Sequence, residues 1–222
     1  MTYREYDPRE FHGPLTDLPE LLRLIGLYYG RGWCMGTSTN FSLRAAQGTA
    51  YLITRSGIDK GRIGAHDFLW IDHTGRPLEP PDARPSAETA LHIVIYQRDD
   101  TARAILHTHS RAATVLSLHH AAAGELVLQG FELQKGLRGI ADHEAALRIP
   151  IYPNSQQIPA LAEEIGHDLR DNPQALPCFL LAGHGLYTWG SSLAQAHQHL
   201  EALEFLFDAH LTRVLYAAAL GG

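Results

Sequence analysis

The sequence predicts an α/β fold in which helices cover both faces of a sheet. Apolar segments with helix-like and strand-like spacing alternate along the chain, and this alternation is typical of a sheet packed between helices. With 222 residues, 45% of them hydrophobic, one domain over residues 1–222 can bury a sizeable core. The glycine fingerprints of dinucleotide and P-loop sites are absent, so we expect no nucleotide site.

Helical spacing of apolar residues marks five segments of the chain. Asp17 is a candidate N-cap of the first, which Gly30 and Gly32 close, and Ser86 and Ser192 are candidate caps of two others. The first expected helix begins after residue 17, the second runs from 86 to about 96, the third covers 111–118, the fourth covers 158–169, and the last begins after 192. A short helix or turn is expected at 131–137.

Seven short apolar runs bounded by turn residues predict strands. They are 41–44, 50–54, 68–71, 104–107, 148–151, 178–181 and 186–189. Two of these runs lead into histidines, one into His107-Thr108-His109 and the other into Gly183-His184-Gly185. Sites in α/β proteins form where strands end, so we expect the chemistry at these two places.

Charge and cysteine content limit the partners and the compartment. The formal net charge is −6 and no block of Lys or Arg stands out, which argues against nucleic acid or an anionic membrane as the main partner. Cys34 and Cys178 cannot form a disulfide framework. The first residues lack the apolar core of a secretory signal, and no run reaches the length of a spanning helix. We expect a cytoplasmic protein with free thiols.

Three histidines form a candidate metal site. His107 and His109 are two apart at a strand end, where side chains at i and i+2 share a face and can approach one zinc ion at about 2.0–2.1 Å. His184 stands between two glycines, which allow a sharp turn at the sheet edge. Among 14 histidines the pair alone is weak evidence, and His184 alone fits a tight turn, so the prediction rests on their combination.

Two glutamates are candidate acid/base groups, and each has a structural alternative. Glu132 lies in a short amphipathic segment bounded by glycines, where a surface carboxylate is unremarkable. Glu88 lies in the first turn expected after Ser86, where the helix dipole alone favours a carboxylate. His92, four residues on, is expected to share its face and to pair with it. The residues by themselves leave these alternatives open.

Three polar loops have the composition of phosphate-binding turns. They are residues 36–40, Ser56-Gly57 and Pro85-Ser86. Each offers hydroxyls and backbone N–H groups, and Ser86 is expected to begin a helix, where anions bind well. Each is also an ordinary turn, so the prediction depends on whether the loops gather near the metal.

The motifs, taken in order, resemble the class II aldolase/adducin family over residues 15–206. They are Gly36-Thr-x-x-Asn40, Thr54-Arg-Ser-Gly57, Ser86-Ala-Glu88, His107-Thr-His-Ser110 and Gly183-His-Gly185. The segments at 54–61, 128–136 and 183–190 are similar to those of the dehydratase branch of that family.

The resemblance implies a three-layer α/β/α fold with a mainly antiparallel or mixed sheet, and a homotetramer. It implies Zn²⁺ on His107, His109 and His184. Glu132 matches the acid/base glutamate of the dehydratase branch, and Glu88 that of the aldolase branch. The positions that match phosphate-binding residues are Asn40, Ser56, Gly57 and Ser86. The chain departs from the pattern at Ser38-Thr39, where relatives usually have two glycines, and at Ala182, where close relatives often have Arg.

The function implied by the resemblance is dehydration of a small phosphorylated keto-sugar in methionine salvage. The expected substrate is 5-methylthioribulose 1-phosphate, with Glu132 protonating the C4 hydroxyl as it leaves. The residues leave open which group removes the C3 proton, Glu132 itself or a metal-bound water. A sugar-phosphate aldolase of the same fold is the alternative enzyme, and an adducin-like module without catalysis is the alternative outside enzymes.

Overall fold

The computed structural model describes residues 16–45, 50–78, 82–172 and 175–221, and the first residues, on which the expectation about a secretory signal rests, lie outside this part. Eight strands form a mixed sheet in the order β3-β2-β1-β4-β8-β7-β6-β5. Neighbouring strands are antiparallel except β6 and β7, which are parallel. The strands are β1 Asn40–Arg44, β2 Tyr51–Thr54, β3 Phe68–Ile71, β4 Ala104–Thr108, β5 Glu125–Leu128, β6 Leu147–Tyr152, β7 Cys178–Leu181 and β8 Gly185–Gly190.

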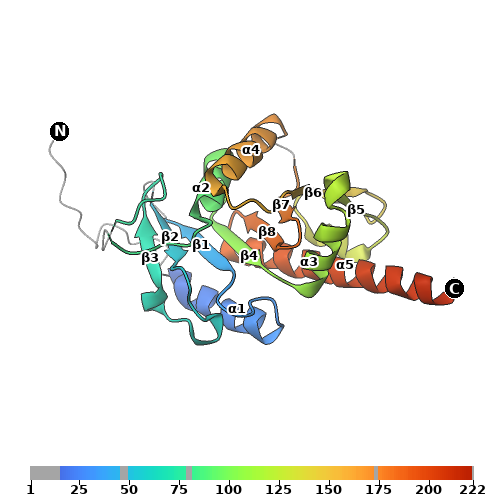
Figure 1. The fold of residues 1–222 in the computed structure, drawn as a ribbon, viewed down its shortest axis with the longest axis horizontal. Coiled ribbons are helices and arrows are strands. Elements are labelled where there is room, and N and C mark those ends of the chain that lie inside the picture. Colours follow the sequence, from blue (N-terminus) through green and yellow to red (C-terminus); the bar gives the residue numbers. More distant parts are fainter. Residues whose placement is uncertain (1–15, 46–49, 79–81, 173–174, 222) are drawn as a thin grey trace.

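Five α-helices in the described residues cover the sheet on its two faces (Figure 1). They are α1 Leu18–Gly30, α2 Thr89–Arg98, α3 Arg111–His119, α4 Ile158–Asp171 and α5 Leu193–Leu220. One buried cluster joins the sheet to α1, α3 and α5, and the other joins it to α2 and α4. The predicted three-layer α/β/α architecture is therefore confirmed.

Strand β4 shows how the sequence divides between the layers. Ala104 and Leu106 pack toward α1, α3 and α5, whereas Ile105 packs toward α2 and α4. This alternation is the period of two that a strand imposes on its side chains. It places His107 on the same face as Ile105, so the predicted site begins on the α2/α4 side of the sheet.

Three sequence-based expectations about local structure need correction. Strand β5 was not expected, because only Leu126 and Leu128 are buried on this short edge strand and two positions are too few to show a period. Asp17 occupies the N-cap position of α1 but makes no capping hydrogen bond. A turn precedes α2, so that Glu88 rather than Ser86 is its N-cap residue.

Helix α5 continues well beyond the packed core. Its buried positions end at His210, and the following residues, 211–220, are almost all exposed. Figure 1 shows this end of the helix projecting past the other elements. Helix α5 is long, but within the described ranges neither this helix nor any other has a stretch apolar enough to cross a membrane.

Close packing of α5 on β8 depends on Gly190. A Cβ atom at this position would lie 2.5 Å from the backbone nitrogen of Ala196. We therefore expect Gly190→Ala to lower the free energy of unfolding by about 1–3 kcal/mol, the usual cost of overpacking, as measured by urea denaturation. The control is Gly26→Ala in α1, where a Cβ would meet nothing within 4 Å, and it should stabilise by about 0.5–1 kcal/mol. Equal stability of Gly190→Ala and wild type would contradict the packing.

Candidate metal centre

The pairing of β4 with β8 brings the three predicted histidines together. His107 lies opposite Tyr187 in the register of these strands, and His184 lies in the turn that joins β7 to β8. Both glycines of that turn are required: Gly183 has φ +64°, and a Cβ at Gly185 would lie 2.1 Å from the carbonyl oxygen of Thr108. The two strands can approach this closely only because residue 185 has no side chain.

The imidazole rings of His107, His109 and His184 form a compact cluster. Their potential ligand atoms all lie within 4.8 Å of one another. The Nε2 atoms of His107 and His109 are 2.7 Å apart, and the ring of His184 lies 4.4 Å from that of His109 and 5.1 Å from that of His107, centroid to centroid. The three residues could therefore hold a single metal ion.

Hydrogen bonds outside the cluster orient two of the rings. The Nδ1 atom of His107 lies 2.9 Å from the carbonyl oxygen of Leu186, which can only accept, so Nδ1 carries the proton and Nε2 keeps its lone pair. Nδ1 of His184 lies 3.2 Å from Oδ1 of Asn154 in the same arrangement. Burial holds the pKa of His107 well below its ordinary value and lowers the pKa of His109 to about 2. Both imidazoles are thus neutral, as metal ligands must be.

The carboxylate of Glu88 lies directly against the histidine cluster. Its Oε1 is 3.2 Å from Nε2 of His184, and its Oε2 is 3.3 Å from Nε2 of His107. Oε2 also accepts hydrogen bonds from Nδ2 of Asn40, at 2.7 Å, and from the hydroxyl of Tyr187, at 2.6 Å. Although Glu88 is the N-cap residue of α2, its side chain makes no capping bond. The carboxylate therefore faces the cluster instead of the helix end.

His92 does not pair with Glu88, contrary to the expectation from their spacing. Its Nε2 contacts Oδ1 of Asn40, and its Nδ1 lies 2.7 Å from the hydroxyl of Ser42. Complete burial lowers the pKa of His92 to about 3, so the ring is neutral. Asn40 thus links the two residues, since one end of its amide contacts His92 and the other donates to Glu88.

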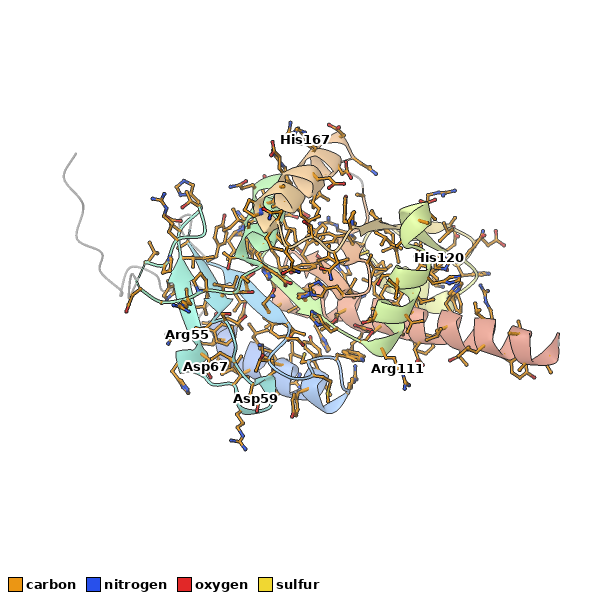
Figure 2. The ribbon with its side chains drawn as sticks, viewed as in Figure 1. Arg55, Asp59, Asp67, Arg111, His120 and His167 are labelled. Carbon is orange, nitrogen blue, oxygen red and sulfur yellow. The ribbon has the colours of Figure 1, made fainter. Side chains whose placement is uncertain are left out.

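Two of the predicted phosphate loops lie side by side near the cluster. The amide of Ser56 donates to the carbonyl of Arg84, and the amide of Ser86 donates to that of Thr54. Arg55, which precedes Ser56, lies beside Asp67 at this edge of the protein (Figure 2), and its amide donates to the Asp67 carbonyl. Gly57 has φ +75°. Ser86 lies two residues before Glu88, and the side chain of Glu88 lies against the histidine cluster. The two loops are therefore connected to the cluster through Glu88.

Glu132 is not part of the histidine cluster of its own chain. It lies in the short 3-10 helix η6, Glu132–Gly136, with 72% of its side chain exposed. Its carboxylate pairs with Lys135, which lowers its pKa, and lies 3.7 Å from Nδ1 of His143. Across the described residues no hydrogen bond or ion pair joins it to His107, His109 or His184.

Three further residues of the centre were not identified from the sequence. Tyr187 and Asn154 contact it as described above. Glu204 of α5 supports it from the opposite face of the sheet, where its Oε1 accepts a 2.7 Å hydrogen bond from Thr108, and burial raises the pKa of its carboxyl to about 7. The place of Tyr187, directly after Gly183-His-Gly-Leu, is the one signal that the sequence offers, and the other two depend on tertiary packing.

The loop before Asn40 contains a strained residue. Thr39 has φ +70° and, among the described residues, is the one non-glycine residue with positive φ. For a β-branched side chain this conformation is a true outlier and costs about 1–3 kcal/mol. It lies in the Ser38-Thr39 pair, at which the resemblance leads us to expect glycine. The backbone therefore has a conformation here that glycine would adopt without strain.

The strain can be tested by restoring glycine. We expect Thr39→Gly to raise the free energy of unfolding by about 1 kcal/mol, because relief of the left-handed conformation exceeds the added entropy of the unfolded chain. The matched control is Ser38→Gly, since Ser38 has no positive φ and its hydroxyl donates a 2.6 Å hydrogen bond to Met35. This control should be destabilised in the same denaturation assay. A loss of stability in Thr39→Gly would contradict the interpretation.

Comparison with known proteins identifies the family. The model of the class II aldolase and adducin N-terminal domain matches residues 19–211. Methylthioribulose-1-phosphate dehydratase of Sorangium cellulosum is 44% identical over 86% of this chain and 90% of its own. The enzyme of that name from Marinobacter nauticus is 47% identical over 82% and 86%. The crystal structure of L-fuculose-1-phosphate aldolase from Thermus thermophilus superposes with a TM-score of 0.71 at 27% identity, covering 92% and 97% of the two chains. The chain therefore belongs to the class II aldolase and adducin family.

Proposed function

We propose that this protein is a zinc-dependent dehydratase that converts 5-methylthioribulose 1-phosphate into 5-methylthio-2,3-dioxopentyl phosphate. The observation that carries the proposal is the 44–47% identity, over more than four fifths of the chain, to proteins named for this activity. The centre built from His107, His109, His184 and Glu88 supports it, because removing water from a keto-sugar requires stabilisation of an enediolate and a group that moves protons.

The donor set of the histidine cluster fits zinc. Zinc in catalytic sites takes three protein ligands and keeps one position open for substrate. Here three imidazole nitrogens converge, and the two rings with outer hydrogen bonds point Nε2 inward. When bound, zinc supplies a Lewis acid that polarises the substrate carbonyl.

In this proposal Glu88 and Glu132 carry out different proton transfers. Glu88, whose carboxylate lies against the cluster, is placed to take the proton from C3 of a keto-sugar bound there. Glu132 protonates the C4 hydroxyl as it leaves, the role suggested by its match to the dehydratase branch. Because Glu132 is exposed and separate from the cluster of its own chain, we propose that it serves the centre of a neighbouring subunit in a homotetramer.

An apolar groove supports this subunit arrangement. Trp33, which lines it, is next to His109, because the backbone carbonyl of Trp33 accepts a 2.8 Å hydrogen bond from the amide of His109. Leu133, next to Glu132, lines the same groove, together with Met35 and Phe205, and all three are exposed hydrophobic residues. Covering this groove with another subunit would remove apolar surface from water and would bring a foreign surface close to the centre.

The adjoining loops at Ser56-Gly57 and Ser86 are proposed to hold the phosphate. The amides of both serines already donate to backbone carbonyls. The hydroxyl of Ser86 accepts a 3.3 Å hydrogen bond from the amide of Glu88, so its own proton, like the hydroxyl of Ser56, is proposed to serve the ligand. Asn40, the fourth predicted residue, has its side-chain amide engaged with Glu88 and His92. We therefore assign Asn40 the alignment of Glu88, in addition to any contact that its loop makes with phosphate.

An aldolase acting on a similar sugar phosphate is the second candidate. The observation in its favour is the position of Glu88 at the cluster, because this glutamate matches the acid/base residue of the aldolase branch. Both reactions pass through an enediolate and need the same metal. They differ in what leaves, which is a hydroxyl in one case and an aldehyde in the other.

The metal is the first test of the proposal. The purified protein should contain about one zinc per chain, and the double variant His107→Ala/His109→Ala should contain almost none, because a single remaining ligand cannot retain the ion. Elemental analysis measures both. The control is His119→Ala/His120→Ala, which removes a neighbouring histidine pair at the end of α3. Full zinc content in the first variant would refute the assigned ligands.

The reaction and the role of Glu132 are tested together. Wild-type protein should dehydrate methylthioribulose phosphate, and Glu132→Gln should keep its zinc but lose about 10²-fold or more in turnover, the scale of a positioned acid. The control Glu125→Gln removes another surface carboxylate, one that pairs with Arg148, and should retain full turnover. Near-normal dehydration by Glu132→Gln would refute its role. Cleavage of fuculose or ribulose phosphates without dehydration would favour the aldolase.

A further inference from the structure

We propose that Tyr187 is a positioning residue of this centre, whose hydroxyl holds the Glu88 carboxylate and whose ring holds His107. The expected effect of Tyr187 on turnover rests on the proposed function. Tyr187 contacts both a histidine of the cluster, His107, and the carboxylate of Glu88. It lies in β8, is fully buried and has no access to solvent.

The hydroxyl of Tyr187 makes the two oxygens of Glu88 unequal. It donates to Oε2 at 2.6 Å, and Nδ2 of Asn40 donates to the same oxygen at 2.7 Å. Oε1 receives neither bond and faces His184. Hydrogen bonds to a charged acceptor are the strong ones, so these two donors fix the rotation of the carboxylate. Oε1 is thereby the oxygen left to exchange a proton with substrate.

The ring of Tyr187 supports His107 from behind. The two rings are stacked at 3.9 Å between centroids with an angle of 16° between their planes. On its other side Tyr187 stacks on Phe179 of β7 at 4.9 Å and 13°. Leu186, the preceding residue, accepts the hydrogen bond from Nδ1 of His107. Two consecutive residues of β8, Leu186 and Tyr187, therefore set both the orientation and the position of the His107 ring.

Two variants separate the roles of the hydroxyl and the ring. Tyr187→Phe keeps the stacking and removes one hydrogen bond to a charged group, so kcat should fall by about 10–100-fold, with KM and zinc affinity close to wild type. Tyr187→Leu also removes the stacking, and its zinc affinity, measured by competition with a chelator, should fall by about 10–100-fold, as when other residues that orient ligands are lost.

The matched control is Tyr152→Phe. Tyr152 is also buried, donates a 2.9 Å hydrogen bond to a carboxylate, that of Asp168, and packs against Phe179. Its variant should keep the turnover and zinc affinity of wild type, although it loses an equivalent bond. This comparison distinguishes positioning of Glu88 from general support of the fold. Thermal unfolding of the metal-free proteins measures directly how much each tyrosine contributes to the stability of the fold.

Each outcome decides the inference. A selective loss of kcat in Tyr187→Phe, with zinc affinity lost only in Tyr187→Leu, supports it. If the wild type is active and the kcat of Tyr187→Phe lies within twofold of the wild-type value, the role of the hydroxyl is overturned. If Tyr187→Leu binds zinc as tightly as the wild type does, the role of the ring is overturned. Wild-type protein that binds zinc but does not dehydrate the substrate overturns the proposed function instead, and in that case zinc affinity still tests the ring.

Discussion

The antiparallel pairing of β4 with β8 is the contact on which the centre depends. It places His107 opposite Tyr187 and brings the turn that carries His184 beside the end of β4. The approach is so close that residue 185 must be glycine, because any Cβ would clash with the Thr108 carbonyl. A shift of one residue in this register would turn the side chains of β8 to the opposite face and would remove Tyr187 and the Leu186 carbonyl from His107.

The opposite face of β4 is also anchored by a hydrogen bond. Thr108 points away from His107 and donates to the buried carboxylate of Glu204 in α5. A polar group in a core costs free energy unless it is hydrogen-bonded, so this pair specifies one position of the strand against the helix. The end of β4 is thus held from both sides, which is what a set of preorganised ligands requires.

The sequence predicted the architecture well, because seven of the strands and the five α-helices of the described residues have clear periodicity or turn signals. It also predicted the three histidines that cluster, because strand ends and flanking glycines are visible in one dimension. It could not predict that Glu88 turns from the helix end to the cluster, since the helix dipole explains a carboxylate there equally well. The links through Asn40 and Tyr187 depend on strand order, which short-range patterns do not contain. The resemblance marked Ser38-Thr39 as a departure from the expected glycines, but the strain at Thr39 could be found only from backbone angles.

The free end of α5 has a consequence for local stability. Beyond His210 about ten residues continue as a helix with almost no buried side chains, and an isolated helix of fewer than about 12–15 residues is marginal in water. This segment therefore remains helical only because it continues a helix that is already nucleated by the core. Its amides should exchange with solvent through fraying from the C-terminal end, whereas those between Leu193 and His210 should open only with the sheet. A single helix thus contains two regions of very different protection, and the boundary lies where the side chains leave the core.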